Sequence, residues 1–175
     1  GEKIIVPRNV HKSVLMGLIL CGATPVYVMP EYSTKWQMWG GVTPETIEKA
    51  FAETPDAKAV LLVSPTYYGL CSDLQAIAEI CHCHNAALLV DEAHGSHLYF
   101  SEQLPLGALE SGADACAQSI HKTAGSFTQS SFLSLGSGRL DEARVAANLQ
   151  MVQSTSPSYL LMASLDAARR GMALH

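Results

Sequence analysis

The chain has 175 residues, of which 48% are hydrophobic and 15% are charged. This composition fits one globular domain with a real hydrophobic core and excludes a disordered chain. The formal net charge is −5, and lysines and arginines are nowhere clustered, so the sequence predicts neither nucleic acid nor an anionic membrane as a partner.

Membrane insertion and secretion are not expected. The apolar stretches are much shorter than the roughly 20 residues of a membrane span, and residues 1–20 lack the ordered features of a signal peptide. The five cysteines are odd in number and scattered, which is typical of free thiols in a reducing compartment. The sequence therefore predicts a cytoplasmic protein.

Short apolar runs alternate with longer amphipathic ones along the chain. This pattern is typical of βα units around a parallel sheet that is buried on both faces. The sequence therefore predicts an α/β fold with three layers, α/β/α, and a mostly parallel sheet. Strands are expected near Lys3–Val6, Pro25–Val28, Lys58–Val63, Ala86–Val90, Ala115–Ser119 and Ser131–Leu135.

Capping signals place the helices between these strands. Gly22 suits the left-handed position that follows a first helix over residues 10–21. Thr43 and Pro44 provide an N-cap and a first-turn proline for a helix over residues 44–53. Ser72-Asp-Leu-Gln75 matches a capping box that opens a helix reaching residue 84. Ser156 and a following proline predict the last helix, near residues 158–170.

The stretch from Pro30 to Val42 has no helical or strand periodicity but contains Tyr32, Trp36 and Trp39. It is expected to be an ordered excursion from the sheet. Its aromatic side chains fit a subunit contact and packing onto the domain's own core equally well.

Two residues at predicted strand ends indicate a cofactor. Asp91 follows the apolar run Ala86-Ala-Leu-Leu-Val90, and Lys122 closes the stretch that begins at Asp114. The carboxyl ends of parallel strands meet in the crevice where open α/β sheets hold ligands. A lysine forms a Schiff base with the aldehyde of pyridoxal phosphate, and a carboxylate keeps the pyridine nitrogen protonated. Lys122 and Asp91 are therefore predicted to serve a pyridoxal-phosphate enzyme.

Neighbours of these two residues have matching chemistry. Ser119 and His121, just ahead of Lys122, could donate hydrogen bonds to a phosphate oxygen. Ala93 is small enough for a flat ring to lie on, and His94 could contact the ring hydroxyl or the substrate. The pair formed by Asp91 and the glutamate after it would also fit a metal site or a helix N-cap.

Two further segments reach the same predicted edge of the sheet. His11 follows the first strand, and its imidazole could stack on the ring face opposite Ala93. Ser64-Pro-Thr-Tyr-Tyr-Gly69 follows the strand that ends at Val63, so Thr66 or Tyr67 could face the cofactor or the substrate. An ordinary strand-to-helix loop explains this segment equally well.

The segment Cys81-His-Cys-His84 looks like a metal site at first. On a helix, residues two apart point nearly opposite ways, so the four side chains cannot converge on one ion. We expect no metal here. A metal hydrolase using His82, His94 and Asp91 is the remotest alternative.

Together these motifs resemble the major domain of the Orn/Lys/Arg decarboxylase family, pyridoxal-phosphate enzymes of the aspartate-aminotransferase fold. The resemblance rests on Arg8-Asn-Val-His-Lys-Ser13, Ser64-Pro-Thr-Tyr-Tyr-Gly69, Asp91-Glu-Ala-His-Gly95 and Ser119-Ile-His-Lys122, which follow the family order. It implies that Lys122 is the Schiff-base lysine, Asp91 the partner of the pyridine nitrogen and His11 the stacking imidazole. It assigns Ser119 and His121 to the phosphate.

The resemblance also implies part of a fold-type-I large domain and a homodimer or larger assembly whose active sites are completed across the interface. The family's glycine- and hydroxyl-rich phosphate loop, which precedes the first strand, and its C-terminal small domain are not found in residues 1–175. The chain is therefore expected to be a partial major domain that by itself binds cofactor weakly and turns over little.

The implied reaction is decarboxylation of a basic amino acid, arginine, lysine or ornithine, to a polyamine precursor. The sequences of the motifs Pro65-Thr-Tyr-Tyr68 and Asp91-Glu-Ala-His-Gly95 are closer to those of the shorter, arginine decarboxylase-like members of the family. An aminotransferase or lyase of the same fold uses the same lysine and aspartate, and a non-catalytic truncated module is the alternative from a different class.

Overall fold

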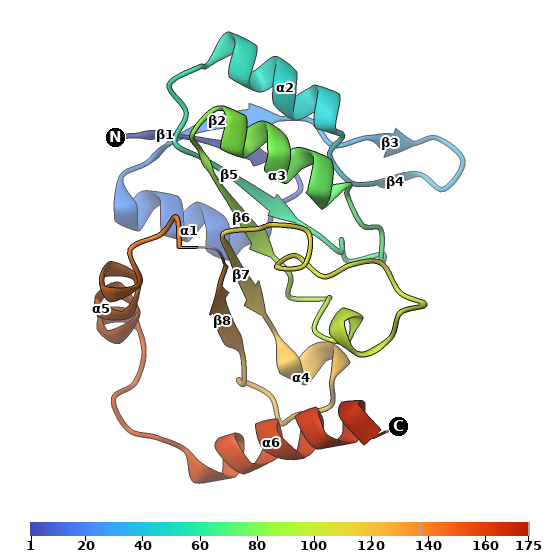
Figure 1. Cartoon of the computed structure of the whole chain (residues 1–175), viewed down its shortest axis with the longest axis vertical. Coiled ribbons are helices and arrows are strands. Elements are labelled where there is room, and N and C mark those ends of the chain that lie inside the picture. The colour runs from blue at the N-terminus through green and yellow to red at the C-terminus, as the bar shows by residue number, and fades with distance from the viewer. Residues whose placement is uncertain (137, 175) are drawn as a thin grey trace.

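The computed structural model describes residues 1–136 and 138–174 (Figure 1). A six-stranded sheet with the order β2-β1-β5-β6-β7-β8 forms its centre. Neighbouring strands are parallel except for β8, which runs antiparallel to β7. The mostly parallel sheet is as predicted. The strands are β1 (Lys3–Pro7), β2 (Thr24–Val28), β5 (Ala59–Val63), β6 (Ala87–Asp91), β7 (Ala115–Gln118) and β8 (Phe132–Leu135).

Helices lie on both faces of this sheet, which confirms the three-layer prediction (Figure 1). Helices α2 (Pro44–Glu53) and α3 (Leu74–Cys83) cover one face, and α1 (Lys12–Cys21) lies on the other. The main core fills the space under α2 and α3, where full burial stabilises each large apolar side chain by about 1.5–3 kcal/mol. Its largest fully buried members are Phe51, Ile5, Ile47, Leu62, Ile77 and Leu88.

The face under α1 is less completely covered. Only Leu18 of α1 is buried, and β5 and β6 alternate buried residues with half-buried ones. Since side chains of a strand alternate between faces, the half-buried set lies on the α1 side. The site described below opens on this side.

The helix ends follow the capping signals, with one correction. Gly22 adopts φ 67°, and the Thr43 hydroxyl accepts a hydrogen bond from the Thr46 amide at 3.3 Å. The predicted capping box at Ser72 is wrong, because Asp73 is the N-cap of α3. Ser72 instead uses its hydroxyl to accept from the Val42 amide at 3.1 Å, which ties α3 to the chain ahead of α2.

The predicted excursion is a short hairpin that projects from the sheet (Figure 1), with strands β3 (Tyr32–Ser33) and β4 (Met38–Trp39). Tyr32 and Trp39 meet edge to face with ring centroids 4.8 Å apart. Trp36 remains 65% exposed. The hairpin is thus only partly packed onto its own domain, and a subunit contact stays a prediction.

Apart from the two hairpin strands, three elements were not predicted, and the last helix was predicted too short. They are η1 (Leu98–Phe100), α4 (Ile120–Thr123), α5 (Glu142–Val152) and α6 (Tyr159–Leu174). Helix α5 has no buried residue in the described structure, although Val145, Leu149 and Val152 recur at helical spacing in its sequence. None of the helices in the described part of the chain combines the length and apolar character that a membrane span requires.

Candidate active site

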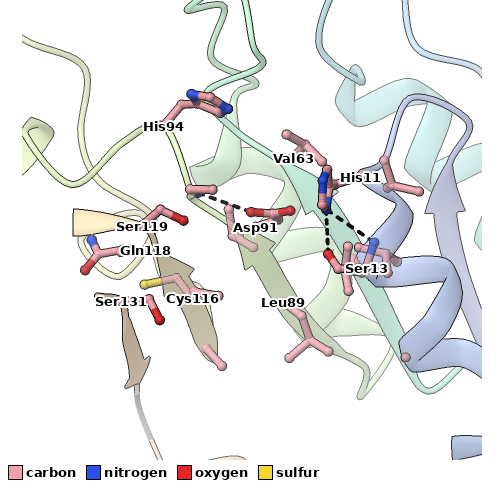
Figure 2. Close-up of a pocket in the computed structure, with 18 of the residues that line it drawn as sticks. His11, Ser13, Val63, Leu89, Asp91, His94, Cys116, Gln118, Ser119 and Ser131 are labelled. Carbon is pink, nitrogen blue, oxygen red and sulfur yellow. Dashed lines mark hydrogen bonds between the residues drawn. The ribbon is translucent and has the colours of Figure 1, made fainter. Parts of the chain in front are cut away.

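A cavity of about 1020 Å³ lies between α1 and the sheet (Figure 2). Most of its polar residues lie at the ends of β1, β5, β6 and β7 or in the segments that follow these strands. Parallel strands bring these segments to one edge because all of them run in the same direction. The cavity therefore occupies the position at which the sequence predicted a ligand.

Asp91 and Lys122 both line this cavity. Asp91 is the last residue of β6, and its Oδ1 accepts a hydrogen bond from the Ala93 amide at 3.2 Å. Lys122 lies in α4, directly after β7, and β7 pairs with β6 through Asp91 and Ala117. Adjacent strands thus deliver a carboxylate and an amine to one space.

His94 lies beside the lysine. Its Nε2 is 3.4 Å from Nζ of Lys122, and its ring meets that of Tyr67 edge to face with centroids 5.7 Å apart. Burial lowers the pKa of His94, the positive charge of Lys122 lowers it further, and Asp91 opposes this shift. A neutral imidazole in this position accepts a hydrogen bond from the lysine.

His11 caps α1 at the cavity wall. Its Nδ1 accepts from the Ser13 amide at 3.2 Å and lies 2.8 Å from the Ser13 hydroxyl. Figure 2 shows the ring on the α1 side of Asp91, with Ser119 on the other side. The two bonds fix the orientation of an otherwise exposed imidazole.

The described structure brings Ser119 to the cavity, together with Ala93. Ser119 is the N-cap of α4, yet its hydroxyl makes no capping bond, so it is free to bind a ligand oxygen. Ser131 also lines the cavity and was missed. It precedes β8, and only the antiparallel direction of that strand carries it to this edge, which the sequence pattern did not reveal.

Two side chains that were predicted to contact the cofactor, those of His121 and Thr66, do not line the cavity. The Nδ1 atom of His121 lies 2.8 Å from the carbonyl oxygen of Ser130, to which it donates. Thr66 is buried, and its hydroxyl accepts from the Leu70 amide at 3.2 Å inside a turn. Tyr67, the alternative to Thr66, does line the cavity and is 79% exposed.

In the cysteine and histidine segment, His82 and Cys81 have other surroundings than a shared ion. His82 binds the buried Asp114 at 3.1 Å, and burial raises the pKa of the Cys81 thiol to about 12. Within residues 1–136 and 138–174, no group of three or more His, Cys, Asp or Glu side chains is placed to hold a metal ion.

The cavity's chemistry fits pyridoxal phosphate instead. It offers an amine for the aldehyde, a carboxylate for the pyridine nitrogen and a free hydroxyl for a phosphate oxygen. These groups belong to Lys122, Asp91 and Ser119, and all of them line one space.

Comparison with known proteins finds arginine decarboxylases among the relatives of this chain. The chain is 50% identical to an arginine decarboxylase of Halalkalibacterium halodurans and 46% identical to one of Bacillus subtilis. Each match covers 99% of this chain but only 35% of the relative, so the chain spans about a third of these proteins.

The fold has solved counterparts. Lysine decarboxylase A from Pseudomonas aeruginosa matches 98% of this chain and 26% of its own, with 29% identity and a TM-score of 0.82. An aspartate aminotransferase of Thermus thermophilus matches 99% of this chain and 47% of its own, with 19% identity and a TM-score of 0.70, which shows the fold alone. The model for "Orn/Lys/Arg decarboxylase, major domain" matches residues 1–174, and the chain belongs to this family.

Proposed function

We propose that the protein containing this chain decarboxylates a basic amino acid with pyridoxal phosphate as cofactor. The observation that carries the proposal is that Asp91 and Lys122, from adjacent strands, line one cavity at the carboxyl edge of the sheet. Family membership supports the same reaction class. The relatives named arginine decarboxylase favour arginine over lysine and ornithine, and the product would be a polyamine precursor.

The residues of the cavity have distinct roles in this proposal. When bound, the cofactor supplies an electron sink that accepts the electron pair left by the departing carbon dioxide. Lys122 provides the amine that holds the cofactor covalently, and Asp91 keeps the pyridine nitrogen protonated. Ala93 and His11 would flank the ring, and Ser119 would bind a phosphate oxygen. His94, beside Lys122, would accept a proton from that amine or contact the substrate.

We further propose that the protein is a cytoplasmic homodimer or larger homo-oligomer. The half-exposed hairpin aromatics Tyr32 and Trp39, with Trp36, support a subunit contact. Within the described part of the chain, the five cysteines are free, as is usual in a reducing compartment.

The test uses the full-length protein with arginine, lysine and ornithine in turn. Release of carbon dioxide without a keto-acid acceptor supports decarboxylation, whereas dependence on such an acceptor would identify an aminotransferase of the same fold. Borohydride reduction followed by mass spectrometry should leave the cofactor attached at Lys122. The variant Lys122→Ala should lose both signals, while Lys49→Ala, at an exposed position on α2, should keep them. Attachment at any other lysine contradicts the assignment.

A further inference from the structure

Glu92 is a fully buried carboxylate directly after Asp91. Asp91 and Leu89 are half-buried and line the cavity, so the alternation along the strand turns Glu92 to the opposite face. A buried carboxylate is costly unless several donors satisfy it. The partners of Glu92 therefore indicate what it does.

Three groups donate to this carboxylate. Its Oε1 accepts from the Ala108 amide at 2.7 Å, and its Oε2 accepts from the Tyr99 hydroxyl and from Nε2 of Gln118, each at 2.8 Å. The Tyr99 oxygen itself accepts from the Leu109 amide at 3.2 Å, so its own proton is directed to Glu92. Each of the three donor groups is thus aimed at the Glu92 carboxylate.

The surrounding backbone is shaped to this carboxylate. A Cβ atom at Gly95 would lie 2.6 Å from Cγ of Glu92 and 2.7 Å from Cδ of Pro65. A Cβ atom at Gly107 would collide with the ring of Tyr99. Because Gly95 and Gly107 have no Cβ atom, the loop can close over the network. The nearby Cys116 thiol is enclosed as well: burial, followed by the charge of Glu92, raises its pKa to about 12.

The network joins the two strands that carry the proposed chemistry. Besides the bond between the side chains of Glu92 and Gln118, the Glu92 amide donates to the carbonyl oxygen of Ala117 at 2.9 Å. Gln118 is the last residue of β7, and α4 with Lys122 follows at once. On the other strand, Glu92 is bonded covalently to Asp91. Displacing Glu92 would therefore change the separation of Asp91 and Lys122.

We propose that Glu92 is a positioning residue, whose bonds to Gln118 and to the 99–108 loop hold Asp91 and Lys122 at their working separation. This inference rests on the proposed function for its catalytic consequence. The competing interpretation is a buried hydrogen-bond network that contributes to stability alone. Asp114 offers a matched comparison, since it is equally buried and accepts from the Leu88 amide and His82, but at the opposite end of β7.

The experiment compares Glu92→Gln with Asp114→Asn in the full-length protein. Both variants should lose thermal stability. Only Glu92→Gln should reduce kcat, by about 10²-fold with little change in KM, because a misplacement of about 1 Å costs that much. It should also shift the pH midpoint of the bound cofactor's visible absorbance, which Asp114→Asn should leave unchanged. Equal stability losses without a change in kcat or midpoint for Glu92→Gln would overturn the proposal.

Two additions keep the test decisive. Tyr99→Phe removes one donor and leaves the carboxylate, so it should give a smaller change of the same kind even if Glu92→Gln does not fold; no change in kcat or midpoint overturns the proposal. In cofactor-free protein, the rate of acylation of Lys122 relative to Lys49 should change in Glu92→Gln or Tyr99→Phe but not in Asp114→Asn. This ratio tests Glu92 even if the wild-type protein releases no carbon dioxide, a result that would count against the proposed function only.

Discussion

Nζ of Lys122 lies 3.4 Å from Nε2 of His94. A protonated lysine only donates hydrogen bonds, so the imidazole nitrogen facing it must be an acceptor. Burial and the charge of Lys122 both lower the pKa of His94, which keeps that ring neutral. The pair is therefore a donor and an acceptor at neutral pH and two repelling cations once His94 is protonated.

This relationship predicts a pH-dependent stability. The pKa of His94 in the folded protein is below its ordinary value of 6.5, so just below pH 6.5 the unfolded chain binds more protons than the folded one. The free energy of unfolding should therefore fall as pH is lowered through this window. Urea unfolding of the full-length protein at a series of pH values measures the slope. The slope should be shallower in His94→Gln, and equal slopes would mean that other groups cause it.

Replacing Asp91 by asparagine should separate catalysis from folding. The amide oxygen can still accept from the Ala93 amide, so the melting temperature should change little. A neutral amide cannot stabilise a protonated pyridine nitrogen, and we expect decarboxylation to fall by about 10²–10³-fold, the usual cost of losing one preorganised electrostatic partner. Steady-state rates and thermal melts of the full-length variant test this. A large loss of stability would indicate a structural role for Asp91.

Much of the fold was predictable because its signals are local. The apolar runs at β5 and β6 and the caps at Gly22 and Thr43 depend on a few neighbouring residues each. Helix α5 was not predicted, although Val145, Leu149 and Val152 recur at helical spacing and Asp141 caps its first turn. The antiparallel direction of β8 was not predicted, because the direction of a strand depends on how the chain connects it to its neighbour and not on the strand's own residues.

The residues of the site also divide into those that local sequence predicts and those that depend on distant contacts. Asp91 and Lys122 were predictable because each follows an apolar strand, and parallel strands share an edge. Glu92 was not singled out, because its importance comes from Tyr99, Ala108 and Gln118, which lie 7, 16 and 26 positions away. Neither the turn around Thr66 nor the bond from His121 to Ser130 could be read from residue type alone.

A methyl group at Gly95 should be strongly destabilising. The Cβ atom of alanine would press on Glu92 and Pro65 at 2.6 and 2.7 Å, and neither neighbour is the free end of a flexible side chain. We expect Gly95→Ala to lower the free energy of unfolding by about 1–3 kcal/mol, as overpacking typically does. Gly171→Ala, in α6 with nothing within 4 Å, should instead stabilise by about 0.5–1 kcal/mol. Denaturant unfolding distinguishes the two, and equal effects would contradict the close packing.

The buried Asp114 gives a prediction at the other end of the sheet. Its Oδ2 accepts from the Leu88 amide at 2.8 Å and from His82 at 3.1 Å, and Arg139 lies 3.7 Å from Oδ1. Asp114→Ala leaves a buried amide without an acceptor, which should cost about 1–3 kcal/mol of unfolding free energy. Arg139 is partly exposed and its contact is the longest of the three, so Arg139→Ala should cost less than Asp114→Ala even though it takes the cation away from the buried Oδ1.

Denaturant unfolding of these two variants and of His82→Ala ranks the contacts of Asp114. His82 makes the closer contact, at 3.1 Å, so its removal should cost more than that of Arg139 but less than Asp114→Ala, because the Leu88 amide still binds the same oxygen. The ranking follows because Asp114→Ala deprives the Leu88 amide of its acceptor, whereas the other two variants leave that hydrogen bond in place. If Arg139→Ala were as destabilising as Asp114→Ala, the ion pair and not the backbone hydrogen bond would be the main stabilising contact of this carboxylate.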